Sequence, residues 1–172
     1  MIRSINRQTS EQATQVLERI HTDAWGPYRT PSLVGETYFF SFTDDYSRKS
    51  WVYTTDARSK LCDIFTEFKV QVELETNKRI KAIRCGNISE YKALAARYGR
   101  DYGIKFEFTT TYTPEQNGVS ERLNRSLVTA ARTMLADAKL PACFWADAIR
   151  TACYLGNRTT IGPDEKTPEE AY

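Results

Sequence analysis

Paired cysteines, histidine and long apolar runs are scarce or absent in this 172-residue sequence. His21 is the only histidine, and none of the four cysteines stands in a C-x-x-C pair. A structural zinc site normally needs four Cys or His ligands in close pairs, so we expect no zinc. Because no secretory signal is present, we expect four free, buried, intracellular thiols. They are Cys62, Cys85, Cys143 and Cys153.

No apolar run reaches the roughly 18 residues that a membrane-spanning helix requires. Residues 1–10 also lack the apolar centre of a signal peptide, so we expect an intracellular protein without membrane contact. No charge of one sign dominates, since 24 Lys and Arg against 22 Asp and Glu give a net charge of +2. Any nucleic-acid surface must therefore come from local clustering of basic residues.

Hydrophobic residues make up 41% and aromatic residues 12% of the chain, which is enough for a sizeable core. We expect a polar linker or N-terminal extension over 1–15 and one domain over 16–172. Strands are predicted over 16–23, in two runs within 37–56 around a turn at 44–47, and over 79–85 and 104–112. Helices are predicted over 59–76, 89–102 and 118–138, and from 141 onwards. This order indicates an α/β fold in which helices flank a mixed sheet.

Two acidic residues stand where such a sheet would hold a site. Asp23 lies at or near the end of the first predicted strand, and Glu121 lies in the first turns of the helix over 118–138. Sites in α/β folds form beyond the carboxyl ends of strands. The fourth predicted strand ends in a glycine, Gly86. Taken alone, Asp23 is equally compatible with an ordinary turn residue.

The helix over 118–138 should have one apolar and one charged face. Its apolar members recur at spacings of three and four, and they are Val119, Leu123, Leu127, Ala130, Met134 and Ala138. Glu121 is roughly 200° from Val119 at about 100° per residue, so it should point away from the core. Arg125, Arg132 and Lys139 share its face. A solvated face with a Glu121–Arg125 pair explains this pattern equally well.

Four blocks, in this order and at this spacing, resemble the integrase core of copia-type long-terminal-repeat retrotransposons. They read HTDAWGP (21–27), FTDDYSRKSWVY (42–53), TYTPEQNGVSERLNR (111–125) and FWADAIRTACYLGNR (144–158). The resemblance implies an RNase H-like fold, with a five-stranded mixed sheet flanked by helices. It also implies that two aspartates and a glutamate hold two Mg²⁺ or Mn²⁺ ions for in-line attack on a phosphodiester.

The resemblance assigns roles to three positions. Asp23 matches the first aspartate and Glu121 matches the glutamate. The second aspartate belongs in a family stretch that reads Arg-Ser-Asp-Asn-Gly-Gly-Glu-Tyr. That stretch is RCGNISEY over 84–91 here, so Gly86 stands at the aspartate position and several neighbours have changed too. We therefore expect weak or lost metal binding at Asp23 and Glu121, and no efficient two-metal catalysis.

The resemblance also implies DNA contacts that do not depend on metal. Tyr112 and Asn117 match contact positions in the loop before the glutamate. Arg125, Arg132 and Lys139 would extend the same surface and bind phosphates without reading sequence. A homodimer and a host protein are further expected partners. DNA as a ligand would place the protein in the nucleus.

The sequence thus predicts a non-catalytic integrase core retained for binding DNA or a protein. Two alternatives stay open. One is an active Mg-dependent strand-transfer or endonuclease enzyme in which Glu90 or Asp45 replaces the missing ligand. The other is a protein-interaction or effector domain on the same scaffold, for which low, salt-insensitive DNA affinity would be evidence.

Overall fold

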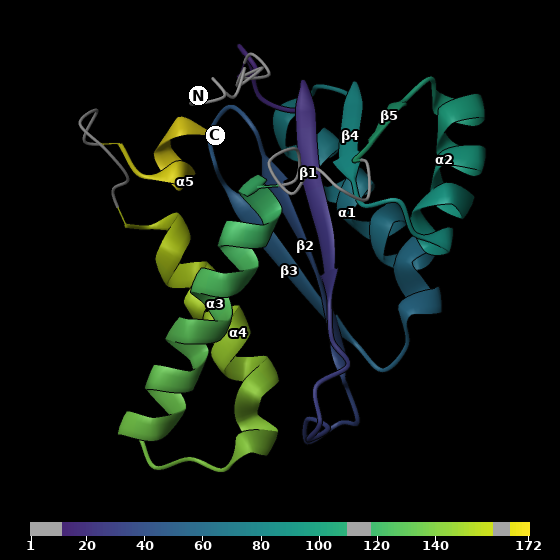
Figure 1. The fold of residues 1–172 in the computed structure, drawn as a ribbon. Coiled ribbons are helices and arrows are strands. Elements are labelled where there is room, and N and C mark those ends of the chain that lie inside the picture. Colours follow the sequence, from purple (N-terminus) through teal and green to yellow (C-terminus); the bar gives the residue numbers. More distant parts are fainter. Residues whose placement is uncertain (1–11, 110–117, 160–165) are drawn as a thin grey trace, which may run out of the picture.

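A five-stranded mixed sheet forms the centre of the molecule, in the order β3-β2-β1-β4-β5 (Figure 1). The computed structural model describes residues 12–109, 118–159 and 166–172. The strands are β1 Arg19–Trp25, β2 Tyr38–Asp44, β3 Ser50–Thr55, β4 Ala82–Cys85 and β5 Lys105–Phe108. β1, β2 and β3 pair antiparallel, whereas β4 runs parallel to both β1 and β5. The predicted sheet is confirmed.

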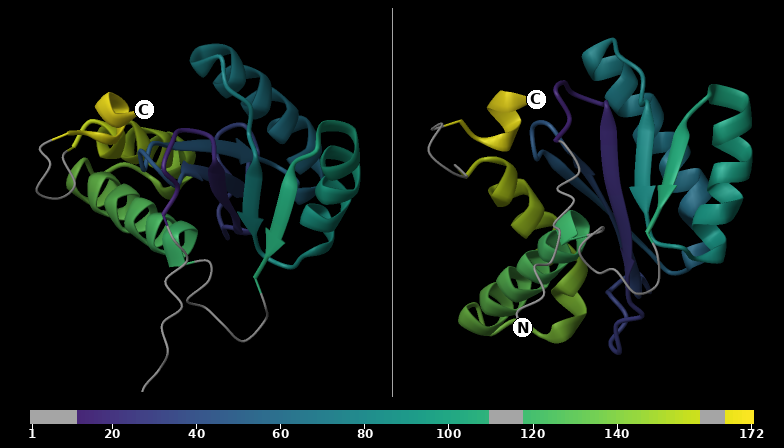
Figure 2. Two further views of the ribbon diagram at one scale, coloured as in Figure 1. Left: turned by 90° about the horizontal axis from the view of Figure 1, so that it is seen from above. Right: turned by 45° about the horizontal axis from the view of Figure 1, so that its top comes forward.

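Helices cover both faces of this sheet. They are α1 Leu61–Thr76, α2 Ser89–Tyr102, α3 Gly118–Asp137, α4 Trp145–Asn157 and the short α5 Pro168–Ala171. α1 and α2 lie on one face, and α3 and α4 lie on the other (Figure 2). The 3-10 turns η1 Arg58–Lys60 and η3 Ala142–Phe144 lead into α1 and α4. No helix in the described ranges is long and apolar enough to cross a membrane.

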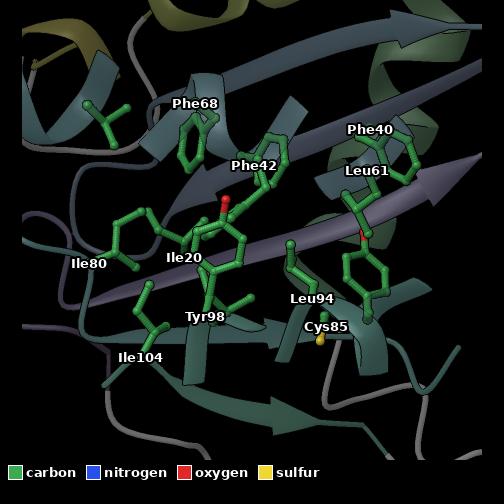
Figure 3. Packing of buried hydrophobic residues seen from close by; sticks show 14 of the residues in the cluster. Ile20, Phe40, Phe42, Leu61, Phe68, Ile80, Cys85, Leu94, Tyr98 and Ile104 are labelled. Carbon is green, nitrogen blue, oxygen red and sulfur yellow. The ribbon is translucent and has the colours of Figure 1, made fainter. Parts of the chain in front are cut away.

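The larger of two hydrophobic clusters lies between the sheet and helices α1 and α2 (Figure 3). Phe42 from β2 stacks on Phe68 from α1, with ring centroids 4.3 Å apart. α1 buries four residues that recur at spacings of three and four, which are Leu61, Phe65, Phe68 and Val72. The second cluster joins Phe39 to residues of α3 and α4, including Leu127 and Trp145. Apolar burial on both faces therefore holds the layers together.

The predicted bounds of α2, residues 89–102, are confirmed. The helix stops at Gly103, which has a left-handed φ of 68°. An L side chain rarely adopts that conformation, so glycine is the favoured residue for ending a helix in this way.

Several predicted boundaries are wrong. β1 begins at Arg19 instead of residue 16, because Leu17 has a φ of 63° and its N–H donates to Asp44 Oδ1 at 2.8 Å. β4 begins at Ala82 and β5 ends at Phe108, so both are shorter than predicted. α5 was not predicted at all, since four residues are too few for a hydrophobic period. Its capping box joins Thr167 and Glu170.

The buried face of α3 also differs from the predicted apolar stripe. The residues that α3 buries are Ser120, Asn124, Leu127 and Ala131. Ala130 and Ala138 of the predicted stripe are exposed. The first turns of α3 lie over a polar part of the sheet, so polar side chains face inward there. The spacing of apolar residues in the sequence therefore could not identify the buried face of α3.

All four cysteines are free thiols, as predicted. Cys85 and Cys153 are buried, and burial raises the pKa of each to about 12. These two thiols are therefore unreactive at neutral pH, because the thiolate is the nucleophilic form. Cys62 and Cys143 are half-buried, so the predicted burial is wrong for these two.

Candidate functional site

The parallel pairing of β1 with β4 brings two of the predicted positions together. Ile20 lies opposite Ile83, and His21 lies opposite Arg84. β4 ends at Cys85, and if the same register continues for two more residues, Gly86 is level with Asp23. Because side chains alternate along a strand, a side chain at position 86 would share the sheet face of Asp23. That face is the one on which α3 packs.

Gly86 is not required by its surroundings. A Cβ atom at this position would meet no heavy atom within 4 Å. Its φ lies outside the left-handed region, whereas Gly26, Gly35 and Gly103 have positive φ. Neither the backbone nor the packing therefore favours glycine over a residue with a side chain.

α3 brings Glu121 and Asn124 to the same end of β1. Asn124 Nδ2 donates to Asp23 Oδ2 at 3.0 Å, and Asn124 is buried. Glu121 stands three residues earlier on an exposed position, and its charge acts on Asp23. Asn124 was not among the site residues predicted from the sequence. Its spacing of three from Glu121 was the available signal, since such residues are neighbours on a helix.

Asp23 is a carboxyl group that is costly to ionise. Burial raises its pKa to about 6, and the nearby Glu121 carboxylate acts in the same direction. Hydrogen bonds from the Ala24 amide and from Asn124 oppose this rise, as does the positive charge of Arg58. Asp23 is therefore partly protonated in weakly acidic solution, well above the usual range for aspartate.

Two of the three predicted helix cations lie as expected. Arg125 and Arg132 are on the exposed face of α3. Lys139 does not continue their line, because α3 ends at Asp137 and Lys139 has a left-handed φ of 53°. Arg122 is an additional exposed cation on this helix. Tyr112 and Asn117 lie outside the described residues.

The described side chains provide two carboxylates at this edge, those of Asp23 and Glu121. The set implied by the resemblance has three carboxylates for two Mg²⁺ ions, which prefer near-octahedral oxygen coordination. Across 12–109, 118–159 and 166–172, no group of three or more His, Cys, Asp or Glu side chains could hold a metal ion. The residues described here therefore do not fit a two-ion centre.

Curated relatives of the chain are plant transposon polyproteins, although no family model matches it. The chain is 40% identical over 156 residues to the retrovirus-related Pol polyprotein from transposon TNT 1-94 of Nicotiana tabacum. That match covers 90% of this chain and 12% of the polyprotein. The retrovirus-related Pol polyprotein from transposon RE1 of Arabidopsis thaliana is 33% identical over 153 residues. That match covers 88% of this chain and 10% of the RE1 polyprotein. The chain thus spans about a tenth of the length of these relatives.

Solved retroviral integrases share the fold. The HTLV-2 integrase catalytic core domain, solved with magnesium in a dimeric form, has a TM-score of 0.60 at 17% identity. The match covers 92% of this chain and 97% of that one. The chain is thus similar in sequence to a segment of retrotransposon Pol polyproteins, and it has the fold of retroviral integrase catalytic cores. A chain of the simian T-cell lymphotropic virus intasome has a TM-score of 0.72 at 15% identity. That intasome was solved in complex with PP2A regulatory subunit B56 gamma. The match covers 94% of this chain and 56% of the intasome chain.

The two candidate substitute carboxylates, Asp45 and Glu90, pair with other groups in the structure. Asp45 follows β2 and lies beside the start of β1, where its N–H donates to the Arg19 carbonyl at 2.9 Å. Its carboxylate accepts a hydrogen bond from the Ala13 N–H at 2.8 Å and lies 2.9 Å from His21 Nε2. Glu90 Oε1 lies 3.1 Å from Arg58 Nε. Both carboxylates are therefore engaged by other partners.

Replacing Asp23 with asparagine should stabilise the domain above pH 6. The pKa of Asp23 is about 6 in the folded protein, compared with the ordinary value of 3.8. Protonated Asp23 therefore stabilises the fold fully below pH 3.8. This stabilisation is lost as the pH rises through 6. Two pKa units correspond to at most about 3 kcal/mol. We expect Asp23→Asn to gain about 1–3 kcal/mol at pH 7.5 and much less at pH 4.

Urea unfolding at both pH values measures this difference. Asp63→Asn, on the exposed side of α1, is the control and should show no comparable gain. An equal effect of Asp23→Asn at pH 4 and pH 7.5 would contradict the raised pKa of Asp23 in the folded protein.

Proposed function

We propose that this integrase-like core binds DNA and does not cut or join it. The observation that best supports this proposal is Gly86, which lies beside Asp23 where the resemblance requires a carboxylate. A two-ion mechanism stabilises both the attacking and the leaving oxygen of the phosphodiester. Without a carboxylate at position 86, one ion position would keep a single protein carboxylate.

The DNA-binding surface of the proposal is the exposed face of α3. Arg122, Arg125 and Arg132 are exposed on this helix. Arginine forms charge-assisted hydrogen bonds with phosphate, and such contacts do not depend on base sequence. Tyr112 and Asn117 belong to the same proposal as contacts from the loop before α3. DNA as the ligand would place the protein in the nucleus.

Removing two of these cations should weaken DNA binding in a salt-dependent way. Each phosphate contact contributes about 0.9 to the slope of log K against log salt concentration. The double variant Arg125→Ala/Arg132→Ala should therefore lose affinity and reduce the slope by about 2, measured by fluorescence anisotropy on duplex DNA. The control is Lys92→Ala/Arg100→Ala, which removes two exposed cations from α2. It should leave the slope unchanged.

Catalysis is tested separately, with labelled duplex DNA in Mg²⁺ and in Mn²⁺. The proposal predicts no nicking and no strand transfer by the unchanged protein. Metal-dependent cleavage that Asp23→Ala abolishes would overturn it, and would support the active enzyme that uses a substitute ligand.

A protein-binding role is the second candidate. Leu33 and Val34 are 64% and 79% exposed, so two large apolar side chains lie in water in the loop between β1 and β2. Such groups favour contact with a partner, either a second copy or a host protein. Low DNA affinity that does not change with salt would favour this candidate over DNA binding.

A further inference from the structure

The interface between α3 and the sheet changes from apolar to polar along β1. At Trp25 it is apolar, because Trp25 stacks on Phe39 with ring centroids 5.2 Å apart and lines a small cavity with Ala131. Two residues earlier on the same face, Asp23 lies opposite Ser41. Opposed residues on neighbouring strands point to the same side, so Ser41 also faces α3.

Two turns of α3 cover this polar part. Asn124 bonds to Asp23, while later turns of the helix contact Trp25, so α3 runs in the same direction as β1. Ser120 lies one turn before Asn124, on the same buried side of α3. Ser120 and His21 are 0% and 2% exposed.

Four side-chain atoms in this region are buried and make no hydrogen bond within the described chain. They are His21 Nδ1, Ser41 Oγ, Ser120 Oγ and Asn124 Oδ1. We call these four side chains the polar seam. Each belongs to a residue that is at most 4% exposed. Seven such unpaired atoms occur across the described ranges, and more than half of them belong to the polar seam.

The hydrogen-bonding roles of these atoms can be assigned. Asp45 Oδ1 lies 2.9 Å from His21 Nε2, and a carboxylate can only accept, so Nε2 carries a proton. In the neutral imidazole, His21 Nδ1 is then an acceptor. Asn124 Oδ1 is also an acceptor. The two serine hydroxyls can each donate and accept one or more bonds.

Buried polar groups are almost always paired with protein or with ordered water, because desolvation without a partner is unfavourable. A buried water typically makes about three hydrogen bonds to such groups. We propose that the polar seam is an internal hydration site, in which ordered water between α3 and strands β1 and β2 bridges its acceptors and hydroxyls.

This water site has a positioning role for Asp23. Water that donates to Asn124 Oδ1 fixes the amide so that its Nδ2 faces the Asp23 carboxyl group. It also explains why α3 buries serine and asparagine where an apolar stripe would otherwise lie. The inference does not depend on whether the domain binds DNA or a protein.

Matched serine substitutions in α3 test the proposal by thermal unfolding. Ser120→Ala and Ser126→Ala bring the same gain in helix propensity, but Ser126 is exposed. A hydrated seam predicts that Ser120→Ala lowers the Tm by about 2–6 °C relative to Ser126→Ala, because the water loses a partner. If the seam is dry, Ser120→Ala removes an unpaired hydroxyl and raises the Tm at least as much as Ser126→Ala, which overturns the proposal.

A high-resolution crystal structure of the unchanged protein is the second test, and it does not depend on any variant folding. The proposal predicts a water oxygen within hydrogen-bond distance of Ser120 Oγ and Asn124 Oδ1. Direct hydrogen bonds among the four side chains, with no water between them, would contradict it.

Discussion

Replacing Gly86 with aspartate is expected to make the stability of the domain depend on Mg²⁺. Position 86 has space for a side chain and lies beside Asp23 on the face where Glu121 acts. A third carboxylate there repels the other two, so Gly86→Asp should be less stable than the unchanged protein in EDTA. At about 100 times the Kd, bound Mg²⁺ would add about 2.7 kcal/mol, which is about 5–10 °C in Tm.

The control for this substitution is Gly86→Asn. Asparagine has nearly the same shape as aspartate but carries no charge, so it tests the steric effect alone. Its Tm should not respond to Mg²⁺. Equal Mg²⁺ responses of the Asp and Asn variants would show that position 86 does not contribute a metal ligand.

Removing Asp45 should produce the largest loss of stability among these substitutions. Its carboxylate accepts from the Ala13 N–H at 2.8 Å and lies 2.9 Å from His21 Nε2. It also lies 3.3 Å from Arg19 Nη1 and 3.2 Å from Arg48 Nη1. Deleting one partner of a buried charged network costs about 3–5 kcal/mol. We expect that loss for Asp45→Ala, measured by urea unfolding at pH 7.

This network also makes the protein sensitive to acid. Burial alone would raise the pKa of Asp45, but hydrogen bonds from His21 and Ala13 hold it well below its usual range. The resulting stability is present above about pH 3.9 and is lost as pH falls. Burial lowers the pKa of His21, so its contribution is present above about pH 6.5 and is also lost on acidification.

Asp101→Ala is the control for Asp45→Ala. Asp101 pairs with Arg100 at 2.9 Å, and both side chains are exposed. Exposed ion pairs contribute about 0–1 kcal/mol, so the control should unfold nearly as the unchanged protein does. A similar small effect of Asp45→Ala would show that the network does not hold the start of β1.

Local patterns predicted much of this fold. Phe65, Phe68 and Val72 recur at the spacing typical of the side of a helix that packs on a sheet. Gly103 ends α2 because glycine readily adopts a left-handed φ. Asp23 was predicted at or near the end of the first strand, and it lies near the end of β1. These features depend on short-range geometry, which a sequence carries directly.

The inner face of α3 could not be predicted in this way. A count of apolar residues favoured Ala130, but the helix buries Ser120 and Asn124 because the sheet beneath them is polar. The Asp45–His21 contact was likewise missed, since it joins the turn after β2 to strand β1. Such features depend on which side chains the tertiary fold places opposite each other.

Calorimetric titration of Mg²⁺ into the unchanged protein tests the central claim most directly. With a glycine at position 86, the account predicts no saturable heat of two-ion binding through the millimolar range. Saturable binding of two ions that Asp23→Ala abolishes would contradict it, because the site would then hold its metal without a carboxylate at position 86.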